Sequence, residues 1–386
     1  MNQRQRAAQD RMGIEKTTRY TLTSLRRSFS SLVSWPARPQ QKYTINKALT
    51  LLLGLSLAGC GGGSQSVLEP AGAQAYRIED LWWLFFGVTG IVYLIVMAVV
   101  LIALLRSRRE QKRASSDTQP DLAPDQQSEK RIGNVIKASV GLTIVILFLF
   151  MVSSFRAGRE ITSLYRAENP LVIKIVGRQW WWEVEYRHDV PSQNVTTANE
   201  IHIPVGRPVR LELESTDVIH SFWVPNLHGK KDLVPGYKTS FIFQADEPGT
   251  YWGQCAEFCG HQHAKMRFVV VAESEADFNN WYTAQQQPSV PPSTDLEKRG
   301  QEIFLVTTCT QCHTVQGTPA NGRVGPNLTH IASRPYIAAG SLRNTEETLA
   351  GWILNPHASK PGVRMPMNTY SNEDLQALVA YLKSLK

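Results

Sequence analysis

The sequence predicts a multidomain chain with three folded parts: a two-helix transmembrane hairpin, an all-β domain and a small all-α domain. Two long apolar runs, at 81–105 and 135–155, predict the hairpin, because about 20 apolar residues are needed to cross a bilayer. Short alternating strands separated by turn residues fill 171–272 and predict a sandwich or barrel. Towards the end, SNEDLQALVAYLKSL (371–385) has the apolar spacing of an amphipathic helix.

Residues 1–59 are predicted to be a lipoprotein-type signal peptide. The stretch is basic and runs into the short apolar segment ALTLLLGLSLAGC, a pattern typical of secretory signals. The cysteine at the end of this segment resembles the cleavage point of a bacterial lipoprotein, so Cys60 is expected to be the lipidated first residue of the mature chain. The alternative is a plain signal peptide with an incidental cysteine.

The chain has a formal net charge of +8, which taken alone would suggest an anionic partner such as nucleic acid. The surplus lies in residues 1–60, which hold ten Lys and Arg against two Asp and Glu. Beyond that segment the chain holds 31 residues of each sign. No nucleic-acid partner is therefore expected.

The hairpin, assigned to residues 60–160 together with the lipidated start, is expected in the bacterial plasma (inner) membrane, in contact with its lipid. Cytoplasmic loops are enriched in Lys and Arg. The segment between the two apolar runs contains Arg106, Arg108, Arg109, Lys112, Arg113, Lys130 and Arg131. This loop is therefore predicted to be cytoplasmic, which puts the later domains on the periplasmic side.

The stretch CAEFCGHQHAKM (255–266) concentrates soft metal donors in one loop. Cys255 and Cys259 are four residues apart, His263 follows by four and Met266 by three. In an oxidising compartment two such thiols form a disulfide unless a metal binds them. A mononuclear copper site needs one Cys, and zinc gains nothing from a thioether. The set favours a pair of coppers, with a disulfide, zinc and mononuclear copper as the alternatives.

A pair of coppers needs a second histidine from a neighbouring loop. His220, in TDVIHSFWVP, is the best candidate among the nine histidines. A lone histidine at a strand end is more often an ordinary polar residue, so this choice depends on the sequence around it.

GRQWWWEVEY, DVIHSFWVP and CAEFCGHQHAKM, in this order after two apolar runs, resemble subunit II of cytochrome c oxidase, of the haem–copper oxidase superfamily, over roughly 75–283. The resemblance implies a cupredoxin-like domain at 161–283 with the binuclear copper centre CuA. The implied copper ligands are His220, Cys255, Cys259, His263, Met266 and the backbone carbonyl of Glu257. The Glu257 carboxylate is implied to help hold magnesium at the interface with subunit I.

Trp180 matches the tryptophan through which electrons enter the copper centre in that family; the alternative is interface packing. Relatives that oxidise quinol lack the copper ligands, so the full set implies cytochrome c as the donor. Many members carry a glutamate near the start of the second span, at the mouth of a proton channel. Glu129 is the nearest acid here, and this role is not assigned to it.

CTQCH (309–313) is a c-type haem attachment signature. Cys309 and Cys312 would form the thioether bonds and His313 would be an axial ligand; a redox dithiol beside a histidine is the alternative. GPNL and RMPM, further along, resemble a class I cytochrome c. This resemblance implies an all-α domain at 297–386, which follows a linker at 284–296.

The sixth haem ligand implied by the resemblance is Met365, the methionine that precedes a proline. A sulfur ligand raises the haem potential. Met367 is the competing thioether, and His330 or His357 would take the role if neither methionine did.

These expectations together describe subunit II of an aerobic terminal oxidase, a cytochrome-c oxidase. Its partners would be oxidase subunit I, the other oxidase subunits and an external cytochrome c or equivalent donor. Electrons would pass through haem c and CuA to subunit I, which reduces oxygen to water and pumps protons. The alternative is a self-standing membrane-anchored copper–haem electron carrier or redox sensor.

Overall fold

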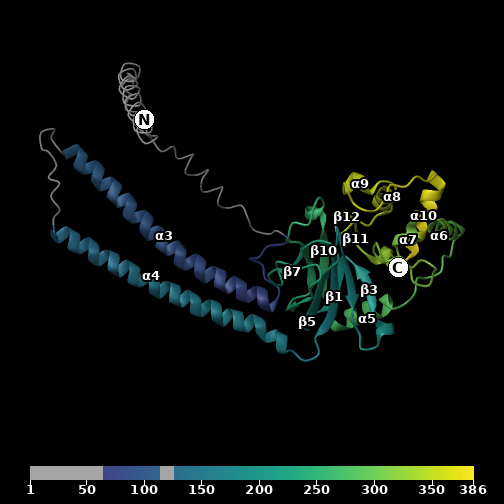
Figure 1. Cartoon of the computed structure of the whole chain (residues 1–386), viewed down its shortest axis with the longest axis horizontal. Helices are drawn as coiled ribbons and strands as arrows, with labels where there is room; N and C mark the ends of the chain where they lie inside the picture. The colour runs from purple at the N-terminus through teal and green to yellow at the C-terminus, as the bar shows by residue number, and fades with distance from the viewer. Residues whose placement is uncertain (1–63, 114–125) are drawn as a thin grey trace, which may run out of the picture. The chain divides into compact units, whose positions relative to one another are not determined.

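The computed structural model of the chain describes residues 64–113 and 126–386. These residues form a pair of long helices, a β-sandwich and a small helical domain, in that order along the chain (Figure 1). This arrangement confirms the predicted fold class. The predicted signal peptide, 1–59, and the lipidation predicted at Cys60 lie outside the described residues.

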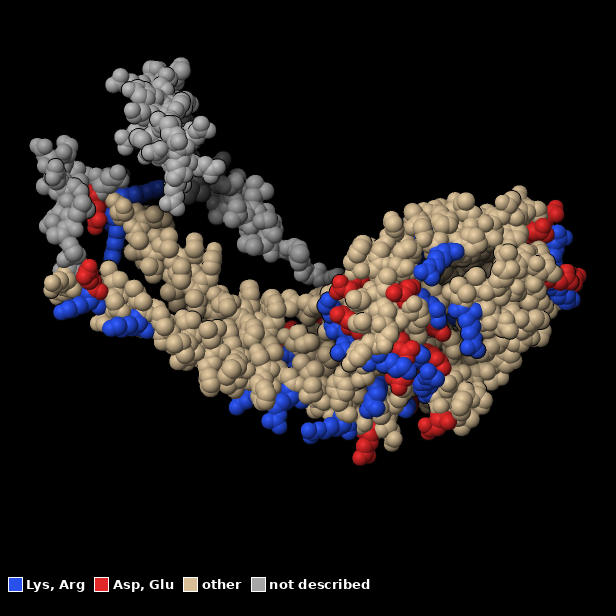
Figure 2. All heavy atoms as spheres, in the orientation of Figure 1, with Lys and Arg blue, Asp and Glu red and all other residues tan. Residues whose placement is uncertain are grey.

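The two long helices are α3 (Ala73–Arg113) and α4 (Gln126–Ile161). Both are long and apolar enough to cross a membrane. Phe85, in the first half of α3, has its ring centroid 4.3 Å from that of Phe150, in the second half of α4, so the helices run antiparallel as a hairpin. Figure 2 shows a long uncharged stretch along both helices, with Lys and Arg towards their ends.

Two five-stranded sheets form the sandwich. The first has the spatial order β3 (Val195–Ala198), β2 (Trp181–Tyr186), β1 (Leu171–Arg178), β5 (Val209–Ser215) and β8 (Thr239–Phe243). The second has the order β4 (Glu200–Pro204), β10 (Arg267–Glu273), β9 (Gly249–Cys255), β6 (His220–Trp223) and β7 (Lys231–Leu233). Neighbouring strands are antiparallel in both sheets except β1 with β5 and β4 with β10, which are parallel.

The core between the two sheets is aromatic. The ring centroid of Trp182, from the first sheet, lies 5.3 Å from that of Phe268 and 6.1 Å from that of Phe222, both from the second. All three side chains are buried. A Cβ added at Gly253 of β9 would lie 2.2 Å from the Phe268 ring, so this ring packs directly on the backbone. The packing therefore fixes the ends of β6 and β9, where the predicted copper ligands begin.

His202 of β4 links this strand to two carboxylates and to a helix. Its Nε2 lies 2.9 Å from Glu200 Oε1 and its Nδ1 lies 2.8 Å from Glu273 Oε1. The ring also stacks on Trp281 of α5 (Glu275–Gln285), with the centroids 4.1 Å apart. Burial opposes a charge on this imidazole, but the two carboxylates outweigh burial, and the pKa of His202 is raised.

The C-terminal domain is built from short helices and one small two-stranded sheet. Its elements are α6 (Asp295–Val306), α7 (Cys309–Cys312), β11 (Tyr336–Ile337), β12 (Leu342–Arg343), α8 (Glu346–Leu354), α9 (Pro356–Ser359) and α10 (Asn372–Ser384). The first and last helices cross closely, because a Cβ added at Gly300 would lie 1.9 Å from the carbonyl oxygen of Ala377. The Phe304 and Tyr381 rings, with centroids 5.7 Å apart, pack beside this crossing.

Four short 3-10 helices complete the described elements. They are η1 (Thr162–Arg166), η2 (Pro191–Gln193), η3 (His263–Lys265) and η4 (Ile331–Ser333). Ser371 caps α10 by accepting a hydrogen bond from the backbone N–H of Asp374, as the spacing of these two residues predicts.

We predict that His202→Gln lowers the free energy of unfolding of the chain more at low pH than at high pH. Because the folded pKa of His202 is raised, its stabilisation is fully present below the pKa of an unfolded histidine, about 6.5. The stabilisation is lost as pH rises through the raised folded pKa. Chemical denaturation across a pH series should show the difference between parent and variant shrinking at alkaline pH. His188→Gln, at an exposed site, is the control. A difference at His202 that grows with pH would contradict the prediction.

Candidate copper and haem sites

The predicted copper ligands lie together at one end of the sandwich. Cys255 ends β9, Cys259 lies in the loop that follows, and the chain then returns along β10. β6 pairs with β9 so that Phe222 is opposite Cys255, and this register puts His220 beside the loop. The backbone N–H of Cys255 also donates to the carbonyl of Met266 at 2.9 Å. Strand pairing therefore brings together donors that are 46 positions apart along the sequence, from 220 to 266.

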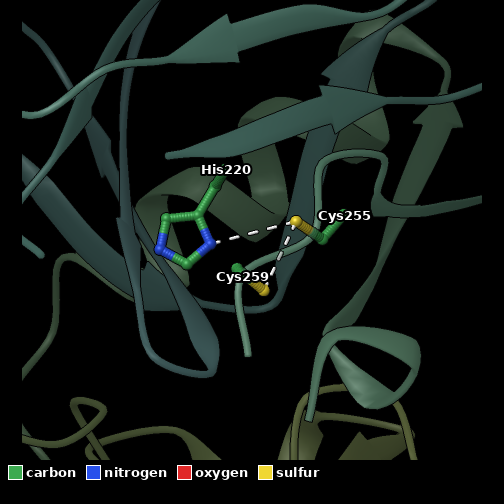
Figure 3. Close-up of side chains that lie close together, drawn as sticks. All are labelled: His220, Cys255 and Cys259. Carbon is green, nitrogen blue, oxygen red and sulfur yellow. Dashed lines mark hydrogen bonds between the residues drawn. The ribbon is translucent and has the colours of Figure 1, made fainter. Parts of the chain in front are cut away.

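The two cysteines are the centre of the group. Their Sγ atoms lie 3.7 Å apart, well beyond the disulfide bond length of about 2.05 Å, so they are two thiols. Figure 3 shows one ring nitrogen of His220 directed at the sulfur of Cys255, with an Nδ1–Sγ distance of 3.9 Å. The carbonyl oxygen of Glu257 lies 3.1 Å from the same sulfur. His220, Cys255 and Cys259 are all buried.

The second sulfur has an equivalent set of neighbours. Cys259 Sγ lies 3.7 Å from His263 Nδ1 and 3.8 Å from Met266 Sδ. Each thiol thus has one imidazole nitrogen and one weak donor beside it. Zinc would use two thiolates and two imidazoles and leave the thioether without a role. Thiolate, imidazole and thioether together are donors that copper accepts, so the residues present fit a copper centre.

Asp217 orients the first histidine, and it is not among the residues predicted from the sequence. Its Oδ1 lies 2.8 Å from His220 Nε2, which leaves Nδ1 for the metal side. Burial raises the pKa of Asp217, but its hydrogen bonds to His220 and to the backbone N–H groups of Gln179 and Val218 outweigh burial, so this pKa is lowered. The sequence feature that could have identified Asp217 is its position three residues before His220, in TDVIH.

The thiol pair releases one proton readily. The hydrogen bond between the two cysteines is the largest cause that lowers the pKa of Cys255, and the bond to His220 adds to it against the opposing effect of burial. The pKa of Cys259 is raised by the same hydrogen bond and by burial. The pair therefore holds a thiolate, the form that binds metals.

Trp180 lies against the loop that carries these donors. Its indole Nε1 donates to the carbonyl oxygen of Cys259 at 2.9 Å, and Gln179 Nε2 donates to the same oxygen at 2.8 Å. A Cβ added at Gly260 would lie 3.1 Å from the indole ring, and the φ of Gly260 is +111°, which favours glycine. The loop therefore approaches the ring closely, and Trp180 is 8% exposed.

Trp180 also lines a cavity of about 580 Å³. It is lined by the predicted haem-binding residues Cys309, Cys312 and His313 and by residues of the sandwich, including Trp180. His313 Nδ1 lies 2.7 Å from the carbonyl oxygen of Pro326, which leaves Nε2 for a metal. Burial lowers the pKa of His313, against the opposing effect of that bond, and favours the neutral imidazole that binds iron.

The structure separates the candidates for the sixth haem ligand. Met365 lines the cavity with His313, whereas Met367 is 64% exposed. His330 is held away from this role, since Nδ1 lies 2.8 Å from the carbonyl of Lys386 and Nε2 lies 3.1 Å from that of Gln287. This leaves Met365 as the thioether on the cavity wall.

The cavity is also suited to the carboxylates of a haem. Its wall carries the cationic residues Arg178, Arg323, Arg334, Lys360 and Arg364. Asp217 is the one acidic residue among the described residues of the wall. Arg334 is 6% exposed, and its Nε has no hydrogen-bond partner in the part of the chain described. A buried donor of this kind needs an acceptor, which a haem carboxylate would supply. The residues present therefore fit a haem.

Residues 171–273 match the family described as cytochrome c oxidase subunit II, periplasmic domain, and residues 297–386 match the family described as cytochrome c. The cytochrome c oxidase subunit 2 of Alkalihalophilus pseudofirmus is 33% identical over 343 residues, which cover 86% of this chain and 95% of the relative. The chain belongs to the cytochrome c oxidase subunit 2 family.

Other subunits of this family show the same relation. Cytochrome c oxidase subunit 2 of Bacillus subtilis is 30% identical over 88% of this chain and 96% of its own length. Among solved structures, the periplasmic domain of subunit II of cytochrome oxidase from Bradyrhizobium japonicum is 27% identical, with a TM-score of 0.29. That match covers 31% of this chain and 96% of the solved domain.

Membership makes the chain a component of an oxidase complex with a copper-site domain and a fused cytochrome c domain. The carboxylates of two further acids predicted to have roles, Glu257 and Glu129, lie outside the copper and haem groups. The Glu257 side chain is 43% exposed and pairs with Lys230 at 3.6 Å, while Glu129 is exposed in the first turn of α4.

We predict that Cys255→Ser or Cys259→Ser abolishes copper binding and leaves the haem in place, because the ligands of the two sites lie in separate domains. Metal analysis of the parent chain, separated from the other oxidase subunits, should give two coppers per chain, and each variant should give none with unchanged haem absorbance. One zinc per parent chain would contradict this prediction.

We predict that Met365→Ala removes the absorption band of the methionine–iron bond in the oxidised haem and lowers its potential, because a sulfur ligand raises that potential. Met367→Ala is the matched control, since this exposed thioether should leave both properties nearly as they were. Visible spectroscopy measures the absorption band, and redox titration measures the haem potential. Loss of the band in Met367→Ala alone would show that Met367 is the ligand and Met365 is not.

Proposed function

We propose that the chain is the electron-accepting subunit of an aerobic respiratory terminal oxidase in the plasma membrane. Electrons would come from an external cytochrome c or an equivalent donor and pass through haem c and the binuclear CuA centre. They would then pass to the haem–copper subunit I, which reduces oxygen to water and pumps protons. The single observation that supports this route best is the position of Trp180, which lines the haem cavity and donates a hydrogen bond to Cys259.

In this proposal the copper ligands are His220, Cys255, Cys259, His263, Met266 and the carbonyl of Glu257. The haem would be held by thioether bonds to Cys309 and Cys312, with His313 and Met365 as the iron ligands. The two cofactors supply the redox chemistry, and the protein supplies binding, orientation and electrostatics. The side chain of Glu257 is proposed to help hold magnesium at the interface with subunit I.

The protein's own contribution to transfer is a rigid and dry environment. The copper ligands Cys255, Cys259, His220 and Met266 are buried, and their positions are set by strand pairing. Donors fixed in advance need little rearrangement when a metal changes its charge. Trp180 is proposed as the residue through which electrons enter the copper centre, because its ring is buried between the copper loop and the cavity.

The proposed partners are subunit I, the other oxidase subunits, the external donor and membrane lipid. The helices α3 and α4 would anchor the chain as a multi-pass protein, with lipidation of Cys60 as a second attachment. Arg106, Arg108 and Arg109 lie at the end of α3, next to the connection between the two helices. By the positive-inside rule, that connection would be cytoplasmic and the copper and haem domains periplasmic.

We predict that Trp180→Phe slows electron transfer from haem to copper by roughly tenfold, comparable with the loss of one hydrogen bond. Phenylalanine keeps an aromatic ring and removes the N–H that bonds Cys259. Flash reduction of the haem in the purified oxidase, followed by its reoxidation at matched copper content, measures the rate. Trp281→Phe is the control, since Trp281 packs on His202 and does not line the cavity.

Purification distinguishes this function from the alternative. A stable complex with a large haem-containing membrane subunit, together with cytochrome c oxidation that consumes oxygen, supports the proposal. A chain that purifies from membranes without such a subunit would instead be a self-standing electron carrier or redox sensor. An unchanged rate of haem-to-copper transfer in Trp180→Phe would show that this tryptophan has only a packing role.

A further inference from the structure

Lys360 is a charged residue in a fully buried position. Its side chain is among the largest that are fully buried, with 1% exposed. It follows α9 and precedes the loop that presents Met365 to the haem cavity, and it lines that cavity. Lysines are almost never fully buried without a partner, so this position calls for a specific reason.

The ammonium of Lys360 connects the two domains. Its Nζ donates to the carbonyl oxygen of Trp180 in the sandwich domain at 3.0 Å and to that of Ala338 in the haem domain at 3.2 Å. The indole of the same Trp180 donates to the carbonyl of Cys259. A continuous series of contacts therefore runs from the haem cavity through Lys360 and Trp180 to a proposed copper ligand.

The residues on either side of Lys360 are also bound to the sandwich domain. Gln262 donates to the carbonyl of Pro361 at 2.6 Å, and Arg364 donates to Gln179 Oε1 at 3.2 Å. Lys265 donates to the carbonyl of Ser359. The segment 359–364 is therefore docked at several points, and Lys360 is the point that reaches the main chain of Trp180.

The charge of Lys360 has no carboxylate partner in the chain as far as the structure describes it, since no ion pair forms at its Nζ. Burial, and next the nearby charge of Lys265, lower the pKa of Lys360 to about 7. An ammonium held by two carbonyls alone is costly to bury. Lys360 lines the haem cavity, and the carboxylates of a bound haem would supply negative charge to this cavity. A buried lysine is thus suited to this junction only if the cavity holds an anionic group.

We propose that Lys360 is a positioning residue for electron transfer: its ammonium holds the main chain of Trp180 at the haem cavity and so fixes the indole between the haem and Cys259. This inference rests on the proposed function, transfer from haem to copper through this chain. Lys360 acts through Trp180 and carries no electron itself.

The test compares Lys360→Met with Lys360→Gln in the purified oxidase complex. The two side chains have the same number of atoms in line and a similar shape, but only glutamine has an N–H that can donate to the carbonyl of Trp180. Lys360→Met should slow haem-to-copper transfer by about tenfold. Loss of a hydrogen bond from a charged group leaves Trp180 in the transfer-competent position for a smaller fraction of the time. Lys360→Gln should retain a rate closer to that of the parent. Lys298→Met, at an exposed site on α6, is the control.

Both variants should keep three properties of the parent: the haem spectrum, the copper content and the rate at which subunit I reoxidises pre-reduced copper. If Lys360 had a purely structural role, its replacement would change these three properties. A parent rate in Lys360→Met, or an equal loss in Met and Gln variants, would overturn the proposal. Absence of haem-to-copper transfer in the parent would instead overturn the proposed function.

A second measurement needs no variant and decides the matter if Lys360→Met does not assemble. In the intact parent complex, treatment with an amine-acylating reagent followed by mass spectrometry should leave Lys360 unmodified while Lys298 reacts. Reaction of Lys360 at the rate of Lys298 in the intact complex would overturn the proposal.

Discussion

The hydrogen bond from the indole of Trp180 to the carbonyl of Cys259 is the interaction on which the rest of the site depends. It fixes the wall of the haem cavity to the loop that carries the copper donors. That loop can approach the ring because Gly260 has no side chain. The two candidate redox sites lie in different domains, yet one buried residue contacts both. Their separation is therefore set by packing, and motion of the linker between the domains does not enter into it.

Several buried polar groups in this chain have incomplete partners within the protein. Arg334 Nε has no acceptor among the residues described, and Lys360 has two carbonyls and no carboxylate. The sulfur atoms of Cys255 and Cys259 lie side by side without forming a disulfide. Each arrangement is costly for a chain alone and becomes favourable with a bound cofactor. The fold is thus arranged around a metal centre and an anionic haem.

Fusion of the haem domain to the copper domain makes the meeting of these two domains an event within one chain. A tethered partner is present at a high effective concentration, so docking becomes an intramolecular event. The contacts of the segment 359–364 then hold one arrangement of the two domains. In the proposed function, an external donor would need to reach only the haem domain, and the later transfer would not depend on a second encounter.

The sequence by itself determined the features that depend on neighbours in the chain. The length of the apolar runs predicts the hairpin, the spacing of Cys255, Cys259, His263 and Met266 predicts a metal loop, and CTQCH predicts haem attachment. These patterns are local, so covalent geometry alone keeps their members close. The family resemblance added His220 and Met365, which lie far from those motifs in the sequence.

Tertiary structure decided what depends on the approach of distant segments. The pairing of β6 with β9 puts His220 beside Cys255, and orientation of one loop puts Met365 on the cavity wall while Met367 faces solvent. Nothing local marks Arg334 or Lys360 as buried, because both residues are usually found at the surface. Their burial follows from how the haem domain folds and packs against the sandwich. Strand register, loop orientation and domain contact are properties of the packed chain, and the spacing of residues along the sequence does not encode them in any local pattern.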